Sequence, residues 1–247
     1  MDVLVTKSDL PSISSLRKLF LEETKFQFIY NKCHENSWSD DYLFTIEGTP
    51  AGYGCIWGKD TREKRDAIYE LYLLPVYRKF SGDILMALQS ASGADFIECQ
   101  TNDPALSPLL FQYTKNINAE AILFEDKNTT SFEFPGVEII KLNENRHCVE
   151  YELKLDGAVA AEGGMMLNYN FPYADLYYHV TEEFRRKGVA TFFIQELKKE
   201  TYAMGRIPAA RCNIHNRISR ASLIKAGFNI CGYIVVGKFA KTPSPDL

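Results

Sequence analysis

A basic turn near the C-terminal end of the chain has the residue types that bind anions. Arg185, Arg186 and Lys187 are followed at once by Gly188. The next segment has apolar residues at helical spacing, at Val189, Ala190, Phe193, Ile194 and Leu197. A helix that begins here leaves its first N–H groups unpaired and carries the positive end of its dipole. Because glycine lets an anion approach the backbone closely, the turn predicts a site for a diphosphate.

The elements that position this turn occur twice in the chain. Alternating runs from Tyr42 and from Tyr151 are each broken by an acidic residue and glycine, which predicts a β-hairpin in each half. Each hairpin is followed by a strand, a basic turn, a helix, a short strand, an asparagine and a second helix. Residues 119–126 and 228–238 are predicted to be the closing strands of the two halves. The repeat predicts an α/β fold with two tandem domains.

The division between the halves is predicted in a polar stretch that contains Pro-Gly, at 126–136. Residues 1–125 then form a first domain and 137–247 a second, each a mainly antiparallel mixed sheet flanked by helices. The first half has an additional amphipathic segment at 10–23. The second half has room for only one strand between the linker and Tyr151, so it is predicted to lack opening helices of its own.

A second motif follows the basic turn, in the order Asn-x-x-Ser and then Lys-x-Gly-Phe. Its residues are Asn216, Ser219, Lys225, Gly227 and Phe228. With the strand, turn and helix before it, this motif resembles the GNAT superfamily of acyl-CoA-dependent N-acyltransferases. Asn216 and Gly227 also suit a helix cap and a helix stop, which is compatible with that role. The resemblance is close over 137–238 and weaker over 1–125.

The resemblance implies that the second half binds acetyl-CoA as a co-substrate. The residues implied to contact the coenzyme are Val180, Arg185, Arg186, Lys187, Gly188, Val189, Ala190, Asn216 and Ser219. It further implies direct transfer of the acetyl group to a primary amine of a small molecule or peptide, without a metal. Because none of these motifs selects an acceptor, its identity stays open.

The corresponding turn of the first half departs from the family pattern. When Arg78 is aligned with Arg185, Ser81 takes the place of Gly188 and Asp83 that of Ala190. A carboxylate repels a diphosphate, and serine restricts the backbone. We therefore expect one coenzyme site per chain and a degenerate first half, with binding in a shifted register through Gly82 as the alternative.

The side chains that most often act as base and acid in the family are absent. The positions of the usual base are Ala174 and Leu176, and that of the usual acid is Leu223. Asp175 has the opposite strand parity to Ala174 and is expected to point away. Family members with this departure also include enzymes, so it does not exclude activity. The oxyanion donor is expected to be a backbone N–H near residues 178–180, whatever the side chain.

Three residues are candidates for proton transfer, alongside a water chain. They are Glu162 on the neighbouring strand, Tyr178 on the coenzyme side and His179. Each has an ordinary alternative: a solvated strand residue, a packed core tyrosine and a surface histidine. If the first half walls the acceptor site, with Trp38 or Trp57 nearby, deletion of 1–125 should abolish turnover and leave a coenzyme-binding fold.

Composition narrows the class of protein. A net charge of −4 and a pI near 5.7 disfavour a nucleic-acid or anionic-membrane surface. That charge also disfavours a tandem-fold aminoacyl transferase that uses charged tRNA. The six cysteines form no CxxC pair, and Cys212 with His215 has no second ligand pair, so no metal is expected.

The chain has no secretory signal and no apolar run of membrane-spanning length, so we expect a cytoplasmic protein that is a monomer or a homodimer. The alternative to an enzyme is a coenzyme A-binding regulatory or scaffold protein without activity.

Overall fold

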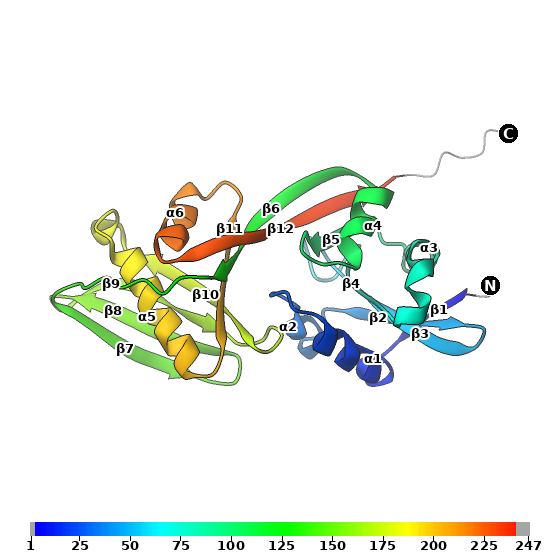
Figure 1. Cartoon of the computed structure of the whole chain (residues 1–247), viewed down its shortest axis with the longest axis horizontal. Helices are drawn as coiled ribbons and strands as arrows, with labels where there is room; N and C mark the ends of the chain where they lie inside the picture. The colour runs from blue at the N-terminus through cyan, green and yellow to red at the C-terminus, as the bar shows by residue number, and fades with distance from the viewer. Residues whose placement is uncertain (1–2, 241–247) are drawn as a thin grey trace. The chain divides into compact units, whose positions relative to one another are not determined.

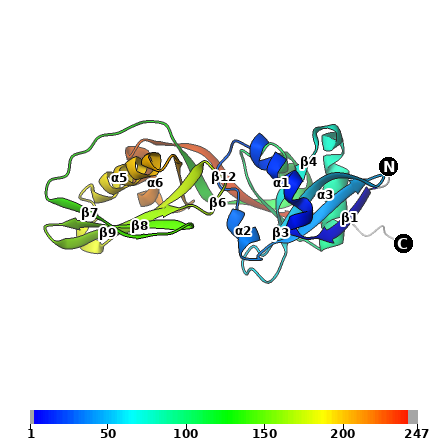
Figure 2. The same ribbon diagram turned by 90° about the horizontal axis from the view of Figure 1, so that it is seen from below.

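The computed structural model describes residues 3–240, which separate into two compact units (Figures 1 and 2). The first unit contains residues 3–26, 33–120 and 233–240, and the second contains 27–32 and 121–232. Each unit has one six-stranded mixed sheet with helices on it. Within the described residues, no helix is long and apolar enough to cross a membrane.

The sheet of the first unit has the strand order β1-β2-β3-β4-β5-β12. Its strands are β1 (Val3–Ser8), β2 (Asp40–Ile46), β3 (Thr49–Trp57), β4 (Ala67–Leu73), β5 (Phe96–Gln100) and the end of β12 (Phe228–Phe239). Its helical elements are α1 (Leu10–Glu23), α2 (Asn31–Glu35), the 3-10 helix η1 (Pro75–Phe80), α3 (Ser81–Ser92) and α4 (Leu106–Tyr113). The helix α1 begins where the Asp9 side chain accepts the Ser12 N–H at 3.0 Å, as predicted from its apolar spacing.

The sheet of the second unit has the order β7-β8-β9-β10-β11-β6. Its strands are the end of β6 (Thr114–Asp126), β7 (Val137–Glu144), β8 (Cys148–Leu155), β9 (Ala158–Met166), β10 (Tyr173–Val180) and β11 (Ile207–Asn213). Its helical elements are the 3-10 helix η2 (Glu182–Phe184), α5 (Val189–Ala203) and α6 (Arg217–Lys225). The long helix α5 packs on β9, β10 and β11 (Figure 1).

The two sheets share one pairing pattern. In each, the only parallel pair of the described residues, β4 with β5 or β10 with β11, has antiparallel neighbours on both sides. The predicted hairpin turns are present at Glu47-Gly48 and Asp156-Gly157, where all four residues have positive φ. The predicted tandem α/β fold with mainly antiparallel mixed sheets is therefore confirmed.

The closing strands are exchanged between the halves, which corrects the sequence prediction. Residues 121–125 of β6 pair with β11 in the second unit, and residues 234–238 of β12 pair with β5 in the first. Strands β6 and β12 have 13 and 12 residues, so each is long enough to begin in one unit and end in the other. An apolar strand pattern shows burial but not the partner strand, and the sequence alone therefore missed the exchange.

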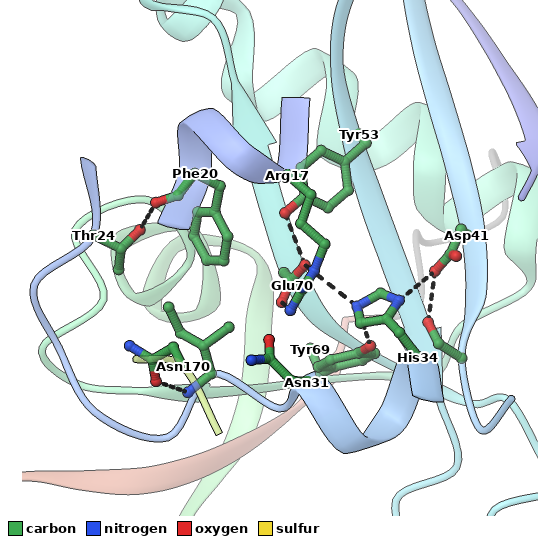
Figure 3. A network of polar contacts seen from close by, with 12 residues as sticks. Arg17, Phe20, Thr24, Asn31, His34, Asp41, Tyr53, Tyr69, Glu70 and Asn170 are labelled. Atoms are coloured by element: carbon green, nitrogen blue, oxygen red, sulfur yellow. Dashed lines mark hydrogen bonds and ion pairs between the residues drawn. The ribbon is translucent and has the colours of Figure 1, made fainter. Parts of the chain in front are cut away.

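A short segment of the first half also belongs to the second unit. Residues 27–32 are largely buried there, and the Ile29 N–H donates to Asn170 Oδ1 at 3.0 Å (Figure 3). The Lys32 N–H donates to the Asn168 carbonyl at 3.1 Å. The units thus differ from the expected division at 126–136, and a fragment without 1–125 would lose two parts of the second unit.

Candidate functional site

The parallel strands of the second unit separate before they end. Strand β10 pairs with β11 only over Tyr173–Leu176, although β10 continues to Val180 and β11 to Asn213. Beyond Leu176, the β11-facing edge of β10 has no strand partner among residues 3–240. Backbone N–H groups at this edge are therefore available to a bound group, as expected for the oxyanion donor.

The predicted anion turn connects this strand end to α5. Gly188 is the residue before the helix and has φ 87°, a conformation that favours glycine, and no described side chain caps α5. The Arg185 Nε donates to the Val180 carbonyl at 3.1 Å, so Arg185 fixes the turn to the strand. Arg186 and Lys187 are exposed, and their charges face solvent beside the uncapped helix start.

The linker packs beside this turn. An added Cβ at Gly188 would lie 3.5 Å from the Phe132 ring and 3.8 Å from the Phe134 ring. The Phe134 and Phe192 ring centres are 5.8 Å apart, and the Thr130 hydroxyl donates to the Ala226 carbonyl at 3.1 Å. Two phenylalanines in an otherwise polar linker were the sequence signal for this contact.

Tyr178 connects the strand to α6. Its hydroxyl lies 2.9 Å from Ser219 Oγ, and Asn216 Oδ1 accepts the Ser219 N–H at 3.0 Å as the cap of α6. Burial raises the pKa of Tyr178, and the hydrogen bond to Ser219 offsets part of this rise. The tyrosine therefore remains protonated at neutral pH and holds a proton at the separated strands.

Glu162 and His179 lie on the other face of the sheet. They are directly opposed on β9 and β10, which brings antiparallel Cβ atoms to about 5 Å, and both are exposed. Because consecutive strand residues face opposite sides, this pair is on the face away from Tyr178. The structure thus brings two of the three candidates together and places the third across the sheet.

Asp175, on the same face as His179, has a different environment. It is 3% exposed, and its Oδ2 lies 3.2 Å from Arg211 Nε. Burial raises the pKa of Asp175 to about 6 even though Arg211 lowers it. The Arg211 guanidinium also donates to the Tyr30 hydroxyl at 3.3 Å, which ties the 27–32 segment to this face. Asp175 is therefore a buried anchor in the second unit, and it points away from Ala174 as expected.

The first unit has the same strand separation, with a cavity beside it. Strand β4 pairs with β5 only at Ala67 and Ile68, although it continues to Leu73. A cavity of about 650 Å³ lies beside this strand end, next to the start of α3 and the loop before α4. The Arg78 Nε donates to the Leu73 carbonyl at 3.2 Å, the same contact that Arg185 makes with Val180.

One position on the strand before the turn has a different side chain in the two units. Leu71 and Tyr178 each lie seven residues before the turn arginine, and each is opposed by a glycine, Gly54 or Gly163, on the neighbouring strand. In the second unit the tyrosine reaches α6, whereas in the first unit the shorter leucine lines the cavity.

A buried charged cluster lies under α1 in the first unit (Figure 3). Glu70 accepts from Arg17 Nε at 2.9 Å and from the Tyr53 hydroxyl at 2.7 Å, and it lies 3.5 Å from His34 Nε2. His34 Nδ1 lies 3.4 Å from Asp41. Burial alone would raise the pKa of Glu70, but Arg17 and His34 outweigh it and lower the pKa to about 2.

This cluster contains ligand types for a metal ion, because possible ligand atoms of His34, Cys55 and Glu70 lie within 4.8 Å of one another. Burial would lower the pKa of His34, but its contacts with Asp41 and Glu70 raise it. With His34 protonated, Arg17 and His34 balance Asp41 and Glu70 without a cation. We therefore interpret the cluster as structural.

Comparison with known proteins places this fold. No family model matches the sequence, and no curated protein matches it. The chain is similar to a GNAT-family acetyltransferase from Colwellia psychrerythraea, with a TM-score of 0.78 and 14% identity over 97% of this chain and 100% of that one. A GCN5-related N-acetyltransferase from Sphaerobacter thermophilus has a TM-score of 0.59, with 10% identity over 96% of this chain and 95% of that one. The chain therefore has the GNAT fold, which confirms the fold that the resemblance implied.

The similarity extends to the tandem arrangement of two such folds in one chain. A tandem GNAT protein from the clavulanic acid biosynthesis pathway matches with a TM-score of 0.64, at 10% identity over 98% of this chain and 100% of that one. Both halves of this chain thus take part in the match, as the internal repeat predicts.

Proposed function

We propose that the second unit is an acyl-CoA:amine N-acyltransferase that uses acetyl-CoA and acts on a primary amine of a small molecule or peptide. The observation that carries this proposal is the basic turn at the uncapped start of α5, directly after a strand with a free edge. Exposed Arg186 and Lys187 and the φ 87° of Gly188 give the turn the charge and backbone shape for a diphosphate. Val180, Val189, Ala190, Asn216 and Ser219 complete the proposed coenzyme contacts.

The acyl-CoA supplies the thioester, and the chain supplies three groups around it. A backbone N–H on the free edge of β10 binds the carbonyl oxygen as negative charge develops on it. Tyr178 gives its proton to the departing thiolate from the face that carries α5 and α6. The pKa of Tyr178 is raised, so its hydroxyl is protonated when the thiolate needs a proton.

The acceptor amine is proposed to approach from the opposite face. His179 lies there with Glu162 opposite it on β9, and the histidine is the proposed acceptor of the amine proton. No metal is used in this scheme. The sheet passes between the two proton-transfer groups, so donor and acceptor meet at the separated strands rather than on one surface.

An inactive coenzyme A-binding regulatory or scaffold protein is the second candidate. One observation favours it: Leu223, at the position of the usual acid, is 1% exposed and packed in the core. Release of free thiol from acetyl-CoA in the presence of a panel of primary amines distinguishes the two. The enzyme releases thiol with at least one amine, and the His179→Ala variant loses this activity. A protein that binds acetyl-CoA but releases no thiol with any amine is the scaffold.

A further inference from the structure

The cavity in the first unit is separate from the proposed transfer site and has the size of a ligand pocket. Its volume of about 650 Å³ lies within the range of about 300–1,000 Å³ that is usual for small-molecule sites. Phe20, Leu71, Leu73 and Leu109, all largely buried, form its apolar wall.

The polar part of the cavity is a strand edge. Beyond Ile68, the β5-facing backbone of β4 has no strand partner among the described residues. The Leu73 carbonyl on this segment accepts a hydrogen bond from Arg78 Nε. A side-chain N–H therefore already takes the place of a neighbouring strand at one point of this edge. Such an edge offers N–H and C=O groups in alternation, and an amide matches both.

Asn102 adds an acceptor at the same opening. It lines the cavity, and its buried Oδ1 accepts no hydrogen bond from residues 3–240. An unpaired buried oxygen of this kind costs free energy. A ligand N–H directed at Asn102 recovers that cost.

The charges around the cavity argue against an anionic ligand. Arg78 is paired with Glu23, and Asp83 occupies the first turn of α3, where an anion would otherwise bind. Asp103 accepts the N–H groups of the next helix start, from Ala105 at 2.8 Å and Leu106 at 3.0 Å. Lys25, another lining residue, is exposed. Arg78, Glu23 and Asp103 are thus engaged by other groups of the protein, and the rest of the described lining presents mainly apolar carbon with amide and hydroxyl groups.

We propose that this cavity is a second ligand site, which binds a neutral, apolar molecule through an amide that pairs with Asn102 and the free edge of β4. This ligand class differs from the anionic co-substrate proposed for the second unit. The first half would then be a recognition domain for another molecule rather than a coenzyme domain that has decayed. The proposal does not depend on acyl transfer by the second unit.

The test compares three probes that share one ring system and differ in charge. They are N-acetyl-L-tryptophanamide, which is neutral, N-acetyl-L-tryptophan, which is an anion, and L-tryptophanamide, which is a cation. Backbone amide signals of the full chain are followed by NMR during each titration. We expect the neutral probe to shift signals of residues 71–73 and 102–109 and to bind about tenfold tighter than either charged probe.

Two variants test the location. Ala105→Trp places a large side chain in the cavity lining and should remove the binding, whereas Ala91→Trp adds the same side chain at an exposed position of α3 and should not. Asn102→Leu keeps the branched shape and the number of non-hydrogen atoms of the side chain, removes its hydrogen-bonding groups, and should weaken the neutral probe about tenfold.

Three outcomes overturn the proposal. They are the absence of shifts at 71–73 and 102–109 with the neutral probe at millimolar concentration, tighter binding of a charged probe, and unchanged binding in both Ala105→Trp and Asn102→Leu. Gly188→Glu serves as a further control, because it should abolish acetyl-CoA binding and leave the neutral probe unaffected. The failure of one site is thus distinguishable from the failure of the other.

Discussion

The two strand openings have the same backbone framework and different side chains. In each unit a parallel pair separates early, and the turn arginine donates to the last carbonyl of the first strand. The second unit then has a glycine turn with exposed basic side chains, and Tyr178 connects the strand to α6. The first unit has Ser81, a paired arginine and an open apolar cavity. A duplicated fold thus preserves the geometry of a site, while a few side chains decide which ligand suits it.

The other faces of the two sheets, away from Leu71 and Tyr178, also have different side chains in the two units. In the first unit, Glu70 lies eight residues before the turn arginine. Its side chain is buried under α1 and pairs with Arg17. The matching position in the second unit is Tyr177, which is exposed, as is His179 two residues further along the strand. A carboxylate with a pKa near 2 is a poor base, so the first unit uses Glu70 for stability, whereas the second unit leaves Glu162 and His179 accessible.

The largest expected effect comes from removing residues 1–125. This deletion takes away the 27–32 segment and the 121–125 strand, which are both parts of the second unit. We expect the remaining fragment to lack cooperative thermal unfolding, because the edge of β11 and the face around Arg211 are uncovered. A fragment that starts at residue 121 restores the strand alone and should be partly stabilised. A fragment 126–247 that melts cooperatively would show that the units are independent, against the exchange described above.

The next effect concerns the buried cluster of the first unit. Glu70→Gln removes the buried carboxylate that pairs with Arg17 and should lower the free energy of unfolding by about 3–5 kcal/mol at neutral pH. Glu22→Gln, which removes an exposed partner of Lys18, is the control and should change it by less than about 1 kcal/mol. Urea unfolding of both variants measures the difference, and equal effects would contradict the structural role of the cluster.

The same glutamate predicts how stability depends on pH. The pKa of Glu70 is about 2 in the folded protein and 4.5 as its ordinary value, so the folded state holds its proton less tightly. Its stabilising contribution is therefore complete above about pH 4.5 and is lost as the pH falls toward 2. The unfolding free energy of the Glu70→Gln variant should fall less steeply across that window than that of the wild type. Parallel pH profiles would exclude Glu70 as the source.

A smaller effect tests the assignment of proton transfer to one face. Tyr178→Phe keeps the ring and removes the hydroxyl, so kcat for acetyl transfer should fall about a hundredfold. Tyr177→Phe changes the same group on the other face and should leave kcat within about twofold. The Tyr178→Phe profile should also lose its alkaline limb, which a merely structural role of the hydroxyl would not remove. Equal rates for both variants would assign the proton to another group.

Local sequence patterns were sufficient for the repeat, the hairpin turns and the helix starts. Acidic-Gly pairs and the apolar spacing after Arg185 to Gly188 determine local geometry, so they could be interpreted without a partner. The face relation of Tyr178, His179 and Glu162 also follows from strand parity once the strands are placed.

Features that depend on distant partners were not predictable. The exchange of β6 and β12, the docking of 27–32 and the contact of Phe132 with Gly188 are set by which surfaces are left uncovered elsewhere. The cavity of the first unit could not be predicted either, because the sequence around Leu71 is that of an ordinary buried strand. The coenzyme and catalytic assignments in the second unit stay predictions.

The central claim is that one of the two related turns binds the coenzyme. Calorimetry with acetyl-CoA compares the wild type with the double variant Arg186→Ala and Gly188→Glu, and with its counterpart in the first unit, Lys79→Ala and Ser81→Glu. We expect about one equivalent to bind with micromolar affinity, binding to be lost in the first variant, and the second variant to bind like the wild type. A wild type that does not bind, or a variant of the second unit that still does, would contradict the account.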